Sequence, residues 1–217
     1  MRRHSTGAGF SLVELLVVLA IIAIVSAFAI PAIMGALQSS SLTSAGDEVS
    51  AMLSLARQHA MARNRQVEVR WYQFADPSFP GEVAGSPSTG HFRAVQAFEI
   101  NESGTAVAFT KMQRLPAGII MDAGTTLSSL FGSTFATSSP QTTSIPPAGT
   151  FYNYCAFRFL NDGSSNIATI GAGSTVGPPW CITLHSLNYG DNLAAPPKNY
   201  ATMDIDPTNG IATIFRP

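Results

Sequence analysis

Charged residues are scarce in this sequence. Of its 217 residues only 12% are charged, and 12 basic residues against 13 acidic ones give a formal net charge of −1. A protein that binds nucleic acid through the phosphates needs basic residues gathered on one face. The basic residues that are close in sequence are expected to span a helix end and a strand instead; they are Arg57, Arg63, Arg65 and Arg70. The sequence therefore argues against nucleic-acid binding.

Motifs for catalysis and for metal or nucleotide binding are also missing. The four histidines have no His-Glu-x-x-His or similar ligand spacing, and no serine lies in a Gly-x-Ser-x-Gly elbow. Residues 171–177 come close to a dinucleotide-binding glycine pattern, but the prolines at 178 and 179 exclude the helix that must follow it. The sequence thus predicts a protein that is not an enzyme and holds no metal or cofactor. The histidines, His4, His59, His91 and His185, are expected in ordinary surface or satisfied positions.

One stretch near the N-terminus carries no charge at all. It runs from Leu15 to Leu37, 23 residues. As a helix it would be about 35 Å long, which is enough to cross a hydrocarbon core of roughly 30 Å. Arg2 and Arg3 precede it, and positive charge before an apolar span keeps that end in the cytoplasm. The bulk of the chain is then expected on the far side of the membrane.

Two other interpretations of this stretch remain open. A secretory signal peptide has a basic start and an apolar core, and Ala27-Phe28-Ala29 would supply its Ala-x-Ala exit. A plain single-pass anchor would need only the apolar run. Glu14 argues against both, because a carboxylate in an apolar span costs roughly 2.5–3.5 kcal/mol and usually implies a partner. A cut after Gly9 would create such a partner, since Phe10 would carry a new cationic amine.

The residues around Glu14 resemble a known motif. Gly9-Phe10-Ser11-Leu12-Val13-Glu14 is similar to the prepilin-type cleavage and methylation motif of type IV pilins and type II secretion pseudopilins. The resemblance implies that a prepilin peptidase cuts after Gly9 and methylates Phe10. It implies that Glu14 meets the terminal amine of a neighbouring subunit during assembly. It also implies a helix kink at Pro31, an inner-membrane span, and a C-terminal domain in the periplasm.

The next segment reads as an amphipathic helix. Over residues 47–64 an apolar stripe recurs at helical spacing, with acidic residues at the start and arginines toward the end, as the helix dipole favours. The stripe consists of Val49, Met52, Leu53, Ala56 and Ala60. A long helix is therefore expected over about 10–65, with Pro31, Gly35 and Gly46 as its bends.

The end of this helix carries a more selective resemblance. Leu55-Ala56-Arg57, Ala60, Arg63-Asn64 and Val67 are similar to the helix-to-strand signature of the minor pseudopilin H group (GspH/FimT type). Arg57 and Arg63 are expected as helix-end and domain-packing groups, or else as merely solvated ones. Some pilin-like proteins of this group act in DNA uptake, so a DNA-binding minor pilin is the alternative function. The partners implied are prepilin peptidase and other pilin or pseudopilin subunits.

From residue 66 onward the apolar pattern changes to a period of two, which indicates half-buried strands. Strands are expected over 67–72, 92–100, 106–113, 151–160, 167–170, 180–187, 200–205 and 211–216. Residues 124–150 are poor in charge and rich in Ser, Thr, Gly and Pro, and they are expected to form a surface insertion that is partly mobile.

The expected fold class is α+β and pilin-like, with a long N-terminal hydrophobic helix packed on an antiparallel β-sheet domain. The expected divisions are a leader at 1–9, the helix at 10–65 and a β-rich periplasmic domain at 66–217. Within the helix, about 10–37 would cross the membrane and about 47–65 would be amphipathic. The expected function is that of a minor pseudopilin or pilin subunit.

The sequence has only two cysteines, Cys155 and Cys181. Both lie in expected strands. Both also follow the apolar span, so they are expected on the far side of the membrane, in an oxidising compartment where paired cysteines tend to be bridged. A disulfide between them would close a loop of about 26 residues and stabilise the fold by roughly 3 kcal/mol. The other possibility is two buried thiols that pack as small apolar residues, because strands that are not neighbours cannot bring two cysteines together.

Overall fold

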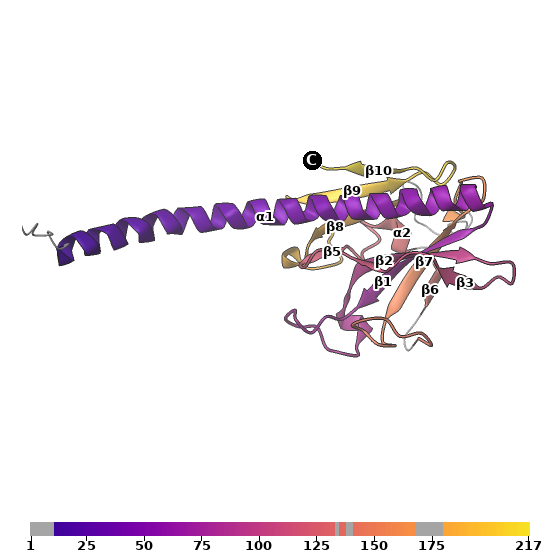
Figure 1. Ribbon diagram of the computed structural model, residues 1–217, viewed down its shortest axis with the longest axis horizontal. Coiled ribbons are helices and arrows are strands. Elements are labelled where there is room, and N and C mark those ends of the chain that lie inside the picture. The colour runs from indigo at the N-terminus through magenta and orange to yellow at the C-terminus, as the bar shows by residue number, and fades with distance from the viewer. Residues whose placement is uncertain (1–10, 133–134, 138–140, 168–179) are drawn as a thin grey trace, which may run out of the picture. The chain divides into compact units, whose positions relative to one another are not determined.

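The computed structural model describes residues 11–132, 135–137, 141–167 and 180–217 (Figure 1). The chain divides into two compact units, residues 1–40 and residues 41–217. The helix α1, Leu12–Arg63, contributes to both. In the first unit the described large apolar side chains of this helix are exposed, with exposed fractions between 46% at Val18 and 78% at Leu12. The exposed apolar residues of this unit therefore lie on every side of the helix.

The C-terminal end of α1 is closed by a Schellman motif. Asn64 follows the helix with a φ of 53°, in the left-handed region that asparagine tolerates better than most residues. The amide of Arg65 donates to the carbonyl of Ala60 at 3.1 Å, and the amide of Asn64 to that of Met61 at 3.4 Å. These bonds satisfy the last carbonyls of the helix and turn the chain into the first strand.

The second half of α1 packs on the sheet through one narrow face (Figure 1). Its buried residues recur every three or four positions, the spacing of a single helix face; they are Leu42, Ala45, Val49, Leu53, Ala56 and Ala60. The expected apolar stripe is thus confirmed, with Met52 partly buried at its edge. Alanine at several of these positions lets the helix approach the strands closely.

The sheet is antiparallel at every described pairing, in the order β10-β9-β8-β5-β2-β1-β7-β6, with β3 and β4 also pairing with β2. Its strands are β1 Val67–Phe74, β2 His91–Ile100, β3 Ala106–Ala108, β4 Gln113–Arg114, β5 Ile119–Met121, β6 Phe135–Thr137, β7 Asn153–Phe159, β8 Trp180–Ser186, β9 Tyr200–Ile205 and β10 Ala212–Phe215. Short helical turns are η1 Pro87–Thr89, α2 Ser129–Gly132 and η2 Leu187–Tyr189. The expected α+β fold, one long helix followed by an antiparallel sheet, is confirmed.

The two faces of the sheet carry separate apolar clusters. Val69 and Trp71 of β1 join the main core with α1. Because side chains alternate along a strand, Tyr72 points to the other face, where it joins a smaller cluster with Phe98 and Tyr152. The sheet is therefore covered on one face by the helix and partly covered on the other by residues of the 141–152 segment.

Residues 124–150 were expected to form a surface insertion, and their first part is instead packed into the domain. Leu127 is 9% exposed and Leu130 is fully buried. The hydroxyl of Ser128 accepts a hydrogen bond from the amide of Thr183 at 3.0 Å, and β6 pairs with β7. The segment lacks a strong apolar pattern in its sequence, because hydrogen bonds of serine and threonine hydroxyls hold much of it against β8. The strand expected over 167–170 lies outside the described residues apart from Ile167, which is buried.

Candidate functional site

The N-terminal end of α1 forms a reciprocal cap around Glu14. Ser11 occupies the cap position, and its hydroxyl accepts a hydrogen bond from the amide of Val13 at 3.3 Å. The carboxylate of Glu14 accepts a hydrogen bond from the amide of Ser11 at 2.9 Å. This is the capping box that the pattern Ser-x-x-Glu produces, and it satisfies two amides that the first turn leaves without partners. The Glu14 carboxylate is thus directed back toward the start of the chain.

The other residues of the expected N-terminal site are only partly described. Gly9 and Phe10, the expected cleavage and methylation positions, lie outside the described residues. The helix assignment runs without a break through position 31, where Pro31 was expected to kink it, and the kink stays a prediction.

Over the part of the chain that the structure describes, no helix combines the length and the apolar character needed to cross a membrane.

Arg57 fastens the second half of α1 to two turns of the sheet domain. Its guanidinium Nε donates to the carbonyl oxygens of Gly163 at 3.2 Å and Asn209 at 2.6 Å. The two turns touch, because a Cβ on Gly210, whose φ is 68°, would lie 2.3 Å from the Gly163 oxygen. The expected packing role of Arg57 is confirmed, and Arg63 lies in the last turn of α1 as a helix-end residue.

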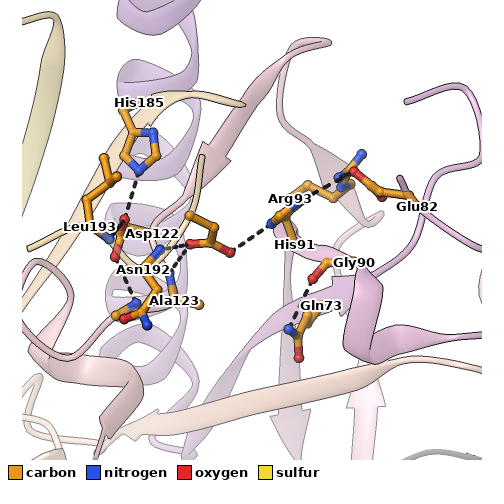
Figure 2. Close-up of polar contacts among 12 residues, drawn as sticks. Gln73, Glu82, Gly90, His91, Arg93, Asp122, Ala123, His185, Asn192 and Leu193 are labelled. Atoms are coloured by element: carbon orange, nitrogen blue, oxygen red, sulfur yellow. Dashed lines mark hydrogen bonds and ion pairs between the residues drawn. The ribbon is translucent and has the colours of Figure 1, made fainter. Parts of the chain in front are cut away.

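A buried acid–base pair joins Asp122, the residue directly after β5, to His185 of β8. His185 Nε2 lies 2.9 Å from Asp122 Oδ2, and both side chains are fully buried (Figure 2). The same carboxylate accepts hydrogen bonds from the amides of Gly124 at 2.8 Å and Leu193 at 3.1 Å. Asp122 therefore holds the 190–193 loop against the strand end.

A second group of acidic and basic side chains includes Asp191, which belongs to the same 190–193 loop. His91 Nδ1 lies 2.8 Å from Asp191 Oδ2, and its other nitrogen lies 3.6 Å from Glu82 (Figure 2). Glu82 also forms a close ion pair with Arg93. Burial raises the pKa of the Asp191 carboxyl, but hydrogen bonds from His91 and from the amides of Ala123 and Asn192 outweigh it, so that the pKa lies below its usual value.

Each histidine in the described part of the chain has an acidic partner. The spacing of the histidines in the sequence predicted neither these pairs nor their positions. His59 lies 2.7 Å from Glu99 and stacks on Phe109, which completes the set. Satisfied histidines were expected, and this is confirmed for the three in the described chain. Within that part of the chain no group of three or more His, Cys, Asp or Glu residues is arranged to hold a metal ion. The pairs of His91 and His185 fasten loops to strands, and the pair of His59 fastens α1 to β2.

The candidate disulfide between Cys155 and Cys181 is wrong. Both residues are described, and both are thiols outside any disulfide. Cys155 lies on β7 and Cys181 on β8, and β5, β2 and β1 separate these strands in the sheet. With neighbouring strands about 4.8 Å apart, four steps put the two positions roughly 19 Å apart, far beyond the ~7 Å limit for a disulfide. The amide of Cys181 instead donates a hydrogen bond to the hydroxyl oxygen of Ser129 at 2.9 Å.

Comparison with known proteins gives a match at the N-terminus. Residues 6–30 match the family described as the prokaryotic N-terminal methylation motif. No curated protein matches the sequence at a significant level.

Two solved structures are similar to this chain. One is the minor pseudopilin EpsH from the type 2 secretion system of Vibrio cholerae, at 10% identity and a TM-score of 0.42, covering 82% of this chain and 98% of that one. The other is the type IV minor pilin FimU of Pseudomonas aeruginosa, at 14% identity and a TM-score of 0.40, covering 82% of this chain and 93% of that one.

The methylation-motif match confirms the resemblance that residues 9–14 indicated. The motif begins before the capped helix start and extends into the apolar stretch of α1. This chain therefore has the prokaryotic N-terminal methylation motif, followed by an α+β fold of one long helix and an antiparallel sheet.

Proposed function

We propose that this chain is a minor pseudopilin or minor pilin subunit. A prepilin peptidase cuts it between Gly9 and Phe10 and methylates the new terminus. It is held in the inner membrane by the apolar part of α1, with its sheet domain in the periplasm, and is built through this helix into a type II secretion pseudopilus or a type IV pilus. The observation that carries the proposal is the methylation motif over residues 6–30.

The geometry at the helix start supports a role for Glu14 in assembly. Its carboxylate bonds to the amide of Ser11, one residue after the proposed new terminus. A cationic amine on Phe10 would therefore lie close to this carboxylate in the same chain, and a neighbouring chain's amine could take the same place. A charge-assisted contact of this kind is stronger than one to a neutral amide.

The apolar surface of α1 supports burial of this helix by lipid and then by other subunits. Large side chains are exposed from Leu12 to Val25 and from Ile33 to Leu37, and an exposed apolar surface of this kind is typical of membrane or protein contact sites. Because residues 15–37 carry no charge, no charged side chain of this stretch has to be desolvated when the helix moves from lipid to a filament core.

The alternative, a DNA-binding minor pilin, has less support. Three of the four arginines that are close in sequence are already used within the chain, so they do not form a basic face open to phosphate. Arg57 bonds to the carbonyls of Gly163 and Asn209, Arg65 pairs with Glu99 and Glu102, and Arg70 pairs with Glu68.

The test compares two substitutions of Glu14. Glutamine removes the charge but can still accept the Ser11 hydrogen bond, whereas alanine removes both. We expect Glu14→Gln and Glu14→Ala to be expressed and cleaved normally but to be lost from sheared filaments, measured by quantitative blotting. Mass spectrometry of the wild type should find N-methyl-Phe10 as its first residue.

The outcomes separate the proposal from its rivals. If only Glu14→Ala were lost, the carboxylate would act as a helix cap and not as an assembly charge. An intact Met1 terminus would contradict processing, and a terminus at Ile30 would indicate a secretory signal peptide.

A further inference from the structure

The face of the sheet away from α1 contains a groove of about 700 Å³, which we call the basic groove. Three parts of the chain line it: strands β1 and β2, the 106–114 segment that includes β3 and β4, and residues 143–147 with Tyr152. All of these belong to the unit of residues 41–217. The groove is therefore a feature of the sheet domain and is separate from the N-terminal assembly helix.

The charges in the basic groove all have one sign. Arg70, Lys111 and Arg114 line it, and its lining includes no Asp or Glu. Three of the chain's 12 basic residues thus gather in one place, although the chain as a whole carries a formal net charge of −1. A concave surface with charge of one sign favours a ligand of the opposite sign.

These three cations are not equally available. Arg70 pairs with Glu68 at 2.7 Å, and Arg114 pairs with Asp76 at 2.9 Å, both acids being outside the lining. Lys111 is exposed, and no hydrogen bond or ion pair joins it to another described residue. Lys111 is accordingly the positive charge that a ligand would neutralise most directly.

The aromatic rings that line the groove do not expose a free face on which a ligand could stack. The Arg70 guanidinium lies 4.1 Å from the centre of the Phe98 ring and so covers one face of it. Tyr72 and Tyr152 are 2% and 4% exposed and meet edge to face. A nucleic-acid strand needs open ring faces on which its bases stack, and these rings do not offer them.

The rest of the lining is aliphatic. Met112, Ile145 and the prolines at 146 and 147 provide apolar contact, while Ala106 and Ala108 keep the groove open because their side chains are small. An aliphatic surface beside an uncompensated ammonium group is complementary to a peptide that carries a carboxylate next to an apolar side chain.

We propose that the basic groove binds a segment of another protein in which an acidic residue lies beside an aliphatic one. Lys111 pairs with the carboxylate, and the aliphatic side chain packs between Met112 and Ile145. Binding here goes beyond filament assembly, because none of the residues involved lies on the apolar half of α1. The sheet domain of an assembled subunit would carry this site on the face that its own helix leaves uncovered.

The experiment uses the full chain in detergent micelles and a library of short random peptides displayed on phage. Peptides that are selected are then measured by fluorescence anisotropy against four variants. Lys111→Glu reverses the unpaired charge, and Lys198→Glu is its matched control, since Lys198 is exposed, lies outside the groove and is the chain's other lysine. Ala108→Trp fills the groove, and Ala195→Trp places the same side chain on an exposed loop.

We expect the selected peptides to be enriched in Asp or Glu beside Leu, Ile or Val. Lys111→Glu should weaken their binding about tenfold or more, and Ala108→Trp should abolish it, with both control variants close to wild type. Replacing the peptide's acid by its amide should also weaken binding, but by less than Lys111→Glu, because the reversed charge adds repulsion. Circular dichroism of each variant checks that the fold is retained.

Three results would overturn the proposal. The first is a selection without enrichment, or with enrichment of peptides that lack acidic residues. The second is equal binding by the Lys111→Glu and Lys198→Glu variants. The third is tighter binding of a short oligothymidylate than of any selected peptide, lost on Lys111→Glu, which would assign the groove to nucleic acid. Loss of filament incorporation in the Glu14 variants bears on assembly alone and leaves these results unaffected.

Discussion

At the scale of single residues, the polar networks are the least predictable part of this protein. Each described histidine meets an acid far away in the sequence, and the pair His91–Asp191 spans 100 positions. No local spacing signals such a pair, because its partners come together only when the strands are in register. The sequence could show that the histidines lack metal-ligand spacing, but not which acid each of them meets.

Asp191 gives a prediction on pH. Its folded pKa lies below the ordinary value of 3.8, so its ionised form stabilises the fold above that pH, and the contribution is lost as pH falls through the lower folded pKa. We expect Asp191→Asn to lower the free energy of unfolding by roughly 1.5–3 kcal/mol at neutral pH, since hydrogen bonds to a charged group are lost. The difference from wild type should shrink at pH values below 3.8.

Urea unfolding of the full chain in micelles over a pH series measures this difference. The other titratable or charged groups around Asp191 are His91, Glu82 and Arg93, and they are the same in both proteins. Asp47→Asn, at an exposed helix position, is the control and should leave the curve unchanged. A constant difference at all pH values would mean that the Asp191 charge does not contribute.

At the scale of elements, the helix was the most predictable part. The apolar stripe of residues 49–60 has a period that belongs to one helix face, and that face is buried in the structure. The expected end at about residue 65 lies two residues after the observed end at Arg63, where Asn64 closes the helix in the left-handed conformation. The Ser-x-x-Glu pattern at the start of α1 is likewise a local signal, of a capping box. The resemblance to the cleavage motif implied a different role for Glu14, in assembly.

Two leucines on opposite faces of α1 test this packing. Leu53 is 1% exposed in the core, and Leu55 is 48% exposed. We expect Leu53→Ala to lower the free energy of unfolding by about 2–5 kcal/mol, because it leaves a cavity between helix and sheet. Leu55→Ala should change it by about 0.5 kcal/mol or less.

Thermal or urea unfolding of the two variants provides the measurement. The substitution is chemically identical in both, so helix propensity cancels from the comparison. Similar losses in the two variants would show that the second half of α1 does not pack through the Leu53 face.

At the scale of the whole molecule, the strands were predictable and their order was not. The period-two segments around β1, β2, β8 and β9 lie close to where the alternation placed them. The insertion of β5 between β2 and β8, and of β1 between β2 and β7, depends on long-range pairing that alternation does not encode. The disulfide prediction failed for this reason, since both cysteines were placed on strands correctly but alternation could not show whether those strands are neighbours.

Thiol labelling tests the strand order directly. We expect both Cys155 and Cys181 to react with an alkylating reagent in the denatured, unreduced protein, because the sheet keeps them on separate strands. Mass spectrometry of peptides counts the labels. A protein in which neither cysteine is labelled would carry a disulfide, and the order of β7 and β8 would then have to be different.

The cap at the start of α1 gives the Glu14 carboxylate two competing partners. In the subunit by itself the carboxylate is bonded to its own backbone, through the amide of Ser11. In the proposed filament it turns to the amine of a neighbour, so that entry of a subunit is an exchange of one bond for another. A subunit that leaves the filament regains its internal bond, and at neither stage is a carboxylate left without a partner in an apolar medium. The exchange makes subunit addition reversible at this residue, and the apolar surface of the helix is left to determine how tightly the filament holds together.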